Sequence, residues 1–206
     1  VSLTWIVPID SGIKANFFVT SFVDVLPTDW RWQYVESLAA SRVTAGCGDG
    51  GFCPERFTSR SEMAVMMLRG KYGRDFLPTA ATDLFEDLNE NHWAIDWVEY
   101  LYTDGITDGC ALDPLRFCPD TAITRAEMAV FLLRAKYGPG YLPSPTQGMF
   151  NDLAGYEWAA DWIEALYQED ITAGCAVNPL QYCPGSAVTR AEMAVFIAKA
   201  FDLPLP

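Results

Sequence analysis

One pattern of residues occurs three times in this chain of 206 residues, and it constrains the fold more than any other feature. Each copy contains Phe-x-Asp, a Trp eight residues after the Phe, a Gly-Cys turn, a Cys-Pro and then Ser/Thr-Arg-x-Glu-Met-Ala-Val. Matching positions are 63 or 65 residues apart, and the two additional residues lie between the paired cysteines of the second and third copies. One structural unit has been copied, so function must be argued from the unit and its multiplicity.

The repeats set the domain organisation. They occupy residues 22–73, 85–138 and 150–202, and two short connectors, 76–82 and 141–148, lie between them. A unit of about 50 residues buries too little apolar surface to be stable by itself. We therefore expect the three copies to pack on one another.

Each copy is expected to begin with an amphipathic helix. In the second copy Trp93, Trp97, Val98, Leu101 and Tyr102 recur at helical spacing, and glycines follow them. The other two copies carry apolar residues at the same offsets. This pattern predicts a first helix in every repeat.

A second helix is expected after a constrained loop. A Ser or Thr precedes each apolar run and a Glu follows it three residues later, which is the spacing of a capping box. The pairs are Ser59 with Glu62, Thr124 with Glu127, and Thr189 with Glu192. Gly73 and Gly138 stand where a left-handed C-cap is expected. The fold class is therefore mainly α, with three helix-loop-helix repeats in a pseudo-threefold bundle.

The cysteines predict a disulfide cross-link in each repeat. They form three pairs, Cys47 with Cys53, Cys110 with Cys118, and Cys175 with Cys183. A zinc site would need C-x-x-C knuckles or several histidines, and the chain has only His92. We expect three disulfides, each stabilising by about 2 to 3 kcal/mol, and an extracellular location.

Charge and hydropathy exclude several classes of partner. The net charge of −13 opposes binding to nucleic acid and to anionic membrane surfaces. No apolar run approaches the roughly 18 residues that a membrane span needs. The chain begins at Val1 without an initiator Met, which predicts either a removed leader or a longer precursor.

Catalysis has little support in the sequence. The chain has one histidine, His92, and no Ser-His or Cys-His pairing is otherwise evident. There is also no phosphate-binding loop. The carboxylates repeat symmetrically, whereas acid and base catalysts need different environments. We expect no enzyme activity, no cofactor and no metal.

The motifs together resemble the S-layer homology domain over residues 22 to 202. The strongest matches are Thr124-Arg125-Ala126-Glu127 and Thr189-Arg190-Ala191-Glu192, with Phe-x-Asp and Trp in register. The resemblance implies a prokaryotic surface protein, a pseudo-threefold helical spindle, and grooves that bind secondary cell-wall polymers, often pyruvylated. Asp49-Gly50 is retained only in the first copy, where Ser59-Arg60-Ser61-Glu62 replaces the Thr-Arg-Ala-Glu sequence.

Two sets of residues are candidates for glycan binding. An arginine at each second-helix N-terminus could hold a carboxylate together with the free amides of the helix, or could form a salt bridge to another repeat. A tryptophan in each repeat could stack on a sugar ring or pack in the core. These residues are Arg60, Arg125 and Arg190, and Trp30, Trp93 and Trp158.

Three aspartates are expected to play a structural part. Asp24, Asp87 and Asp152 follow the Phe of each repeat, before the first helix. We expect them to cap or brace the turn into that helix. The alternative is a calcium site, although no loop offers a dense set of oxygen ligands.

Residues 1–21 lie outside the repeats and are predicted to form an extended arm. Apolar residues alternate with others along the first nine positions, and more apolar residues follow. The apolar members are Val1, Leu3, Trp5, Val7, Ile9, Phe17 and Phe18. The arm could dock on the next subunit and propagate a polymer, or could fold back over its own repeats.

Two functions follow from these observations. In the first, the protein is a non-enzymatic extracellular subunit that self-assembles through its arm into a surface filament or S-layer-like homo-polymer. In the second, it is a cell-wall anchoring module that binds an anionic, pyruvylated polysaccharide.

Overall fold

The computed structural model describes residues 20–79 and 81–206. The predicted arm residues Val1, Leu3, Trp5, Val7, Ile9, Phe17 and Phe18 therefore lie outside the described part of the chain. Every statement about structure below concerns the described residues.

The prediction of a mainly α fold is confirmed. The α-helices are α1 Trp32–Ala40, α2 Arg60–Tyr72, α3 Ile95–Thr103, α4 Arg125–Tyr137, α5 Ala160–Gln168 and α6 Arg190–Ala200, with a 3-10 turn, η1, at Glu157–Ala159. The strands are β1 Ala111–Leu112, β2 Leu115–Arg116, β3 Ala176–Val177 and β4 Leu180–Gln181. Among the described residues, no helix has the length and hydropathy that crossing a membrane requires.

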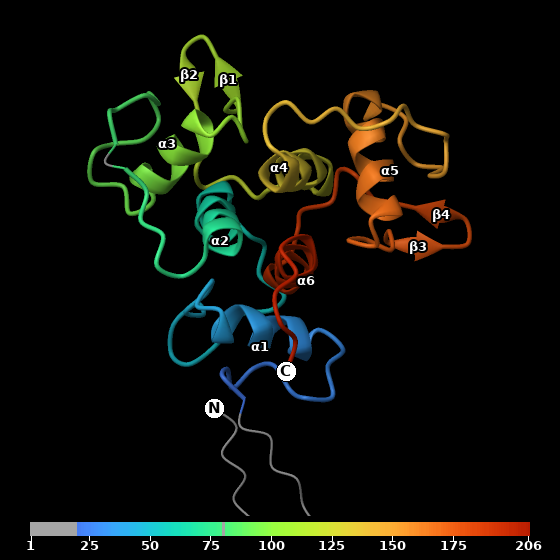
Figure 1. Ribbon diagram of the computed structural model, residues 1–206, viewed down its shortest axis with the longest axis horizontal. Coiled ribbons are helices and arrows are strands. Elements are labelled where there is room, and N and C mark those ends of the chain that lie inside the picture. The colour runs from blue at the N-terminus through green and yellow to red at the C-terminus, as the bar shows by residue number, and fades with distance from the viewer. Residues whose placement is uncertain (1–19, 80) are drawn as a thin grey trace, which may run out of the picture.

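Three lobes surround three central helices (Figure 1). Helices α2, α4 and α6 pack against one another in the middle, and each comes from the second half of a repeat. The outer helix of each lobe comes from a different repeat: α3 packs on α2, α5 on α4, and α1 on α6. Each lobe is thus built from two repeats, and the contact between α1 and α6 joins the two ends of the chain into a closed ring.

The central helices are buried on nearly every side. Met63, Met67, Met128, Leu132 and Met193 are completely buried on them. A helix surrounded by other elements needs apolar residues all round and has no polar face. Their sequences therefore lack the periodicity of the outer helices.

All three predicted capping boxes are present. The side chains of Ser59, Thr124 and Thr189 accept from the amides of Glu62, Glu127 and Glu192, whose carboxylates bond back to the cap amides. The predicted left-handed C-caps differ in detail. Gly73 has φ 88° and ψ 172°, and Gly138 has φ 94° and ψ 165°. That region is open essentially to glycine alone, so the chain leaves the helix in an extended direction.

Neighbouring repeats also join through their backbones at the start of the central helices. Short antiparallel bridges pair Phe57 with Thr189, Ser59 with Ala122, and Thr124 with Ala187. The first amide of each central helix donates to a carbonyl of another repeat, as Arg60 N does to Thr121 O at 2.9 Å. The orphan amides of these helices are thereby satisfied within the ring.

The cysteines form the three predicted disulfides, each within its own repeat. Cys110–Cys118 and Cys175–Cys183 close the hairpins β1–β2 and β3–β4, which contain the two additional residues of these copies. Cys47–Cys53 spans a shorter turn in which Gly48 pairs with Gly51. The tips of the hairpins β1–β2 and β3–β4 point outward from their lobes (Figure 1).

Candidate functional site

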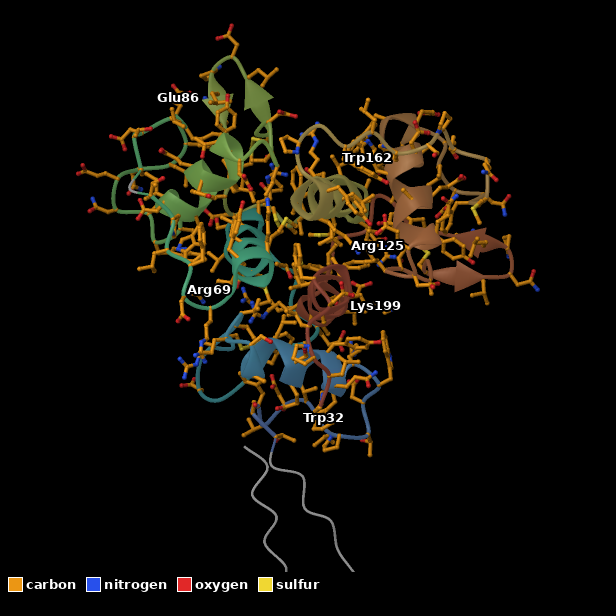
Figure 2. The ribbon with its side chains drawn as sticks, viewed as in Figure 1. Trp32, Arg69, Glu86, Arg125, Trp162 and Lys199 are labelled. Carbon is orange, nitrogen blue, oxygen red and sulfur yellow. A yellow bond between two sulfur atoms is a disulfide. The ribbon has the colours of Figure 1, made fainter. Side chains whose placement is uncertain are left out.

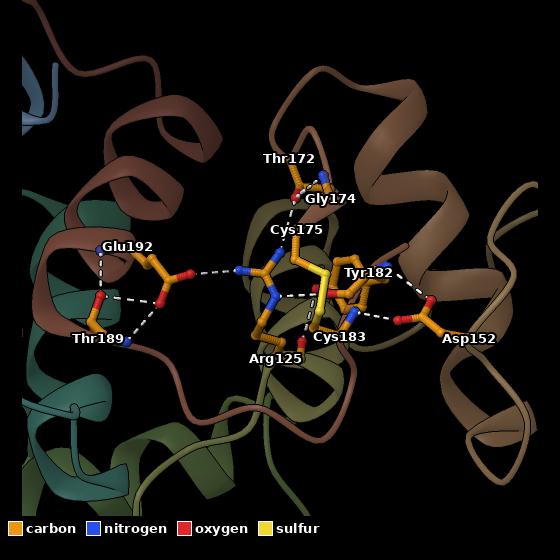
Figure 3. A network of polar contacts seen from close by, with 9 residues as sticks. All are labelled: Arg125, Asp152, Thr172, Gly174, Cys175, Tyr182, Cys183, Thr189 and Glu192. Carbon is orange, nitrogen blue, oxygen red and sulfur yellow. Dashed lines mark hydrogen bonds and ion pairs between the residues drawn. A yellow bond between two sulfur atoms is a disulfide. The ribbon is translucent and has the colours of Figure 1, made fainter. Parts of the chain in front are cut away.

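The three motif arginines form a closed ring of ion pairs between repeats. Arg60 Nη1 lies 2.7 Å from Glu127 Oε1, Arg125 Nη1 lies 2.9 Å from Glu192 Oε1, and Arg190 Nη1 lies 3.1 Å from Glu62 Oε1. Each glutamate therefore caps its own helix with one oxygen and receives the arginine of another repeat with the other. Figure 3 shows this arrangement around Arg125 and Glu192.

The guanidinium groups are buried against the disulfide loops. Their side chains are only 2%, 5% and 3% exposed. Each Nε donates at 2.8 Å to the carbonyl of the residue before the second cysteine, and the guanidinium lies over that residue's ring. These residues are Phe117, Tyr182 and Phe52 for Arg60, Arg125 and Arg190 respectively. Burial lowers the pKa of Arg60 and of Arg190, and the paired glutamates oppose that shift.

The three arginines differ in the hydrogen bonding of Nη2. Arg125 Nη2 donates to Thr172 Oγ1 at 3.5 Å, and Arg190 Nη2 donates to Gly46 O at 3.1 Å. Arg60 Nη2 is buried without a hydrogen-bond partner among the described residues. A buried donor without an acceptor is costly, so an additional acceptor would be stabilised at this point of the ring.

The structure therefore contains the inter-repeat salt bridges that were one of the two expectations for the arginines. Their helix-terminal amides are also occupied by carbonyls of other repeats. Glycan contact by Arg60, Arg125 and Arg190 stays a prediction; Arg60 Nη2 lacks a hydrogen-bond partner among the described residues but is buried from solvent.

The tryptophans of the motif lie on the surface. Trp30, Trp93 and Trp158 are 67%, 62% and 56% exposed, at the start of the three outer helices. The alternative that they pack in the core is wrong; the aromatic residues four positions later, Tyr34, Trp97 and Trp162, pack partly buried against the core. Three broad aromatic side chains therefore face solvent at equivalent positions.

The aspartates do not cap the first helix, and that expectation is corrected. Asp24 accepts from the amides of Phe52 and Cys53, both at 2.7 Å, and the other two aspartates bind their own disulfide loops in the same way. The second cysteine of each pair has a φ of 57° or 58°, a strained conformation that these hydrogen bonds hold in place. Burial alone would raise the pKa of Asp24, but the donated amides lower it below its ordinary value.

Each aspartate also lies close to the two sulfur atoms of its disulfide. The sulfur atoms are joined in disulfides and offer no thiolate ligand. Each aspartate accepts two amides of its own disulfide loop and so braces that loop.

A further set of carboxylates was missed by sequence reasoning. Glu36, Glu99 and Glu164 project from the outer helices and accept the amides of the chain that leads into each repeat. Leu84 N donates to Glu99 at 2.8 Å, and Met149 N donates to Glu164 at 2.6 Å. A glutamate at the same offset in all three copies was the available signal, but its partner could not be inferred without the path of the connector.

Comparison with known proteins assigns the fold to a family. Residues 21–64 and 84–129 match the S-layer homology domain. The third repeat carries the same disulfide, capping box and buried arginine. S-layer homology domains are non-catalytic modules that bind cell-wall polymers.

The relatives are much longer proteins. The chain is 29% identical over 189 residues to an endoglucanase of Bacillus sp. (strain KSM-635), covering 90% of this chain and 19% of that protein. It is 27% identical over 177 residues to an amylopullulanase of Thermoanaerobacterium thermosulfurigenes, covering 86% of this chain and 8% of that protein. It is 26% identical over 182 residues to an S-layer protein of Bacillus thuringiensis subsp. finitimus, covering 87% of this chain and 21% of that protein.

The chain thus spans about a fifth of the relatives' length or less. The shared region supports a role at the cell surface, in attachment to the surface or to the cell wall. The chain thus contains two segments that match the S-layer homology domain, 21–64 and 84–129, and a third repeat that shares their disulfide, capping box and buried arginine.

Proposed function

We propose that this chain anchors to the cell wall by binding an anionic, pyruvylated wall polysaccharide at three equivalent surfaces, one on each lobe. The observation that carries the proposal is the exposure of Trp30, Trp93 and Trp158 at matching positions of a closed ring. The chain itself is proposed to be non-enzymatic, because its repeated carboxylates are caps, braces and ion-pair partners.

The tryptophans suit a sugar ligand. An indole offers a large apolar face and one polar N–H, which matches the apolar face and hydroxyl rim of a pyranose. Leaving such a side chain in water contributes nothing to the core, and the same exposure recurs in all three lobes. A repeating polymer could engage several lobes at once, so weak contacts at each lobe would add up through multivalency.

The arginine ring gives the surface its rigidity. It fixes the starts of the central helices and, through Phe52, Phe117 and Tyr182, the disulfide loops. Arg60 Nη2 has no hydrogen-bond partner among the described residues but is buried between the first and second repeats, so a carboxylate of the ligand would reach it only after local opening. The net charge of −13 opposes any anion, so an acidic ligand needs a local cation.

Binding of the parent chain to purified wall polysaccharide tests the proposal. We expect saturable binding that weakens when the pyruvyl ketals are removed by mild acid. Equal binding to the treated and untreated polymer would show that the carboxylate is not recognised, and no binding to either would refute the anchoring function. Alanine substitution of Arg125 or Arg190 is unsuitable as the main test because both residues support the fold.

A second candidate function concerns self-assembly into a surface polymer through the N-terminal arm. The alternation of apolar residues over positions 1–9 favours it, and an S-layer protein is among the relatives. The test is deletion of residues 1–20, followed by sedimentation and electron microscopy of the parent and truncated proteins. If both assemble alike, arm donation is wrong.

A further inference from the structure

A cleft of about 470 Å³ lies between the end of α6, helix α1 and the loop after α5. Tyr34 and Lys199 lie in its lining, together with Leu203 and Leu205 of the C-terminal tail. Figure 2 labels Lys199 beside α6. The cleft belongs to the lobe in which the two ends of the repeat array meet.

The same place is filled by aromatic rings in the other two lobes. In the lobe of α2 and α3, the ring of Phe76 stacks on Tyr72 at 4.6 Å and meets Trp97 at 6.0 Å. In the lobe of α4 and α5, Tyr141 lies 4.7 Å from Tyr137 and 5.9 Å from Trp162. Both inserted rings, Phe76 and Tyr141, belong to connectors.

Tyr34 stands at the position of Trp97 and Trp162, and Asp202 stands at that of Tyr72 and Tyr137. Among the described residues, no connector lies along this side of α1 before Thr20. The described residues therefore leave the cleft open.

Hydrogen bonds fix the register in which a connector lies along an outer helix. Ala81 N donates to Asp96 at 2.7 Å and Thr82 N donates to Glu99 at 2.6 Å. Leu84 N then donates to the other oxygen of Glu99.

The connector that leads into the third repeat follows the same register. Thr146 N donates to Asp161 at 2.7 Å, and Gln147 N and Met149 N donate to the two oxygens of Glu164. Two connectors of different sequence therefore follow the same path.

The first repeat shows the end of the same path. Ser21 N donates to Glu36 Oε1 at 2.7 Å, which matches the bonds of Leu84 and Met149. Glu36 corresponds to Glu99 and Glu164, and Gln33 corresponds to Asp96 and Asp161. The acceptors for a third connector are thus present on α1.

We propose that residues 13–19 of the same chain dock along α1 as this third connector and insert into the cleft. In the shared register Phe18 N–H would donate to the side chain of Gln33, and Val19 N–H would donate to Glu36. Ile13 would take the place of Phe76 and Tyr141 against Tyr34.

Charge supports this occupant. The cleft contains three carboxylates, Glu169, Asp170 and Asp202, with Lys199 as its one cation, and Glu169 is shared with Lys136. Residues 1–19 contain a single cation, Lys14, which the register places beside Ile13 at the cleft. An acidic cleft thus faces the one basic residue of the segment.

Docking would close the pseudo-threefold ring with the two ends of the chain. The C-terminal tail would supply the start of the third connector and residues 13–19 would supply its remainder. The inference stands independently of polysaccharide binding.

Residue-resolved hydrogen exchange of the full chain tests the proposal. We expect the Phe18 and Val19 amides to exchange at least about tenfold more slowly than the same amides in a free peptide of residues 1–20. The protection should be independent of protein concentration under conditions where ultracentrifugation shows a monomer. Lys14→Glu should reduce the protection several-fold, and the matched variant Asp10→Lys, outside the docked segment, should leave it unchanged.

Three results would overturn the proposal. Unprotected amides at every concentration would mean that the segment does not dock. Protection that appears only as the protein associates would mean that a second copy supplies the segment. Equal effects of Lys14→Glu and Asp10→Lys would mean that the acidic cleft does not receive Lys14. Both substitutions lie outside the three repeats in the sequence, and the melting temperature of each variant checks that the repeats stay folded.

Discussion

Arg190 Nη1 donates to Glu62 Oε1 at 3.1 Å, although 128 positions of the chain separate the two residues. This ion pair joins the third repeat to the first and completes a ring in which every repeat holds the next. The glutamates serve as helix caps and as ion-pair partners at once. The repeat motif therefore encodes the assembly of the three copies as well as the start of a helix.

Glu62→Gln should destabilise the protein by about 3 kcal/mol or more, because it leaves the Arg190 guanidinium buried without its counter-charge. Glutamine is compatible with the N3 position of a capping box, so the variant keeps the cap and removes the charge that pairs with Arg190 and with the more exposed Arg56. Equilibrium unfolding in denaturant measures the change. Asp75→Asn, at an exposed carboxylate that pairs with Arg74, is the control and should have little effect. Equal stabilities of the two variants would mean that the ring contributes nothing.

Stability should fall as the pH is lowered below about 4, in part through Asp24. Its folded pKa lies below the ordinary 3.8, because amide donation outweighs burial. A group with a depressed pKa contributes stability above its unfolded pKa and loses it as the pH falls through the folded value. Asp24→Asn should therefore be less stable than the parent at pH 7, and the difference should shrink toward pH 2. A difference that is constant across this range would contradict the assignment.

Replacing Cys110 and Cys118 with serine should lower the free energy of unfolding by about 2 to 3 kcal/mol, as the chain-entropy model gives for a short loop. Asp87 still accepts the amides of Phe117 and Cys118, so the loop should keep its path and the global fold should persist. Thermal unfolding with far-ultraviolet circular dichroism measures both quantities. Complete loss of structure would mean that the disulfide is essential to the fold.

A single repeat should not fold by itself. The fragment 85–138 contains α3 and α4, but α3 packs on α2 of the preceding repeat and α4 is surrounded by α2, α5 and α6. We expect this fragment to show little helix by circular dichroism, whereas the fragment 20–206 should retain the helix content of the parent. A cooperative unfolding transition in the fragment 85–138 would contradict the conclusion that each outer helix needs the central helix of another repeat.

The secondary structure could be predicted from local signals. Ser59, Thr124 and Thr189 mark helix starts because an N-cap and its glutamate lie within four residues of each other. The cysteine pairs were equally local, because the partners stand six or eight positions apart. Repetition made both signals stronger, since the same spacing recurred in each copy.

The parts that were not predicted depend on contacts between distant residues. Asp24 reaches residues 28 and 29 positions away, so the nearby first helix was a misleading partner. Trp30 and Trp32 stand two positions apart, and only the packing of α1 on α6 decides which of them is buried. The partner of Arg125 lies 67 positions along the chain, which periodicity does not reveal.

The most direct test of the anchoring account is the affinity of the triple variant Trp30→Ala, Trp93→Ala and Trp158→Ala for purified wall polysaccharide. The matched control replaces Leu77 and Leu142, which are 82% and 85% exposed, with alanine. The account predicts that the triple variant keeps the melting temperature of the parent and binds at least about tenfold more weakly, a loss of roughly 1.4 kcal/mol, while the control binds as the parent does. Undiminished binding by a folded triple variant would contradict it.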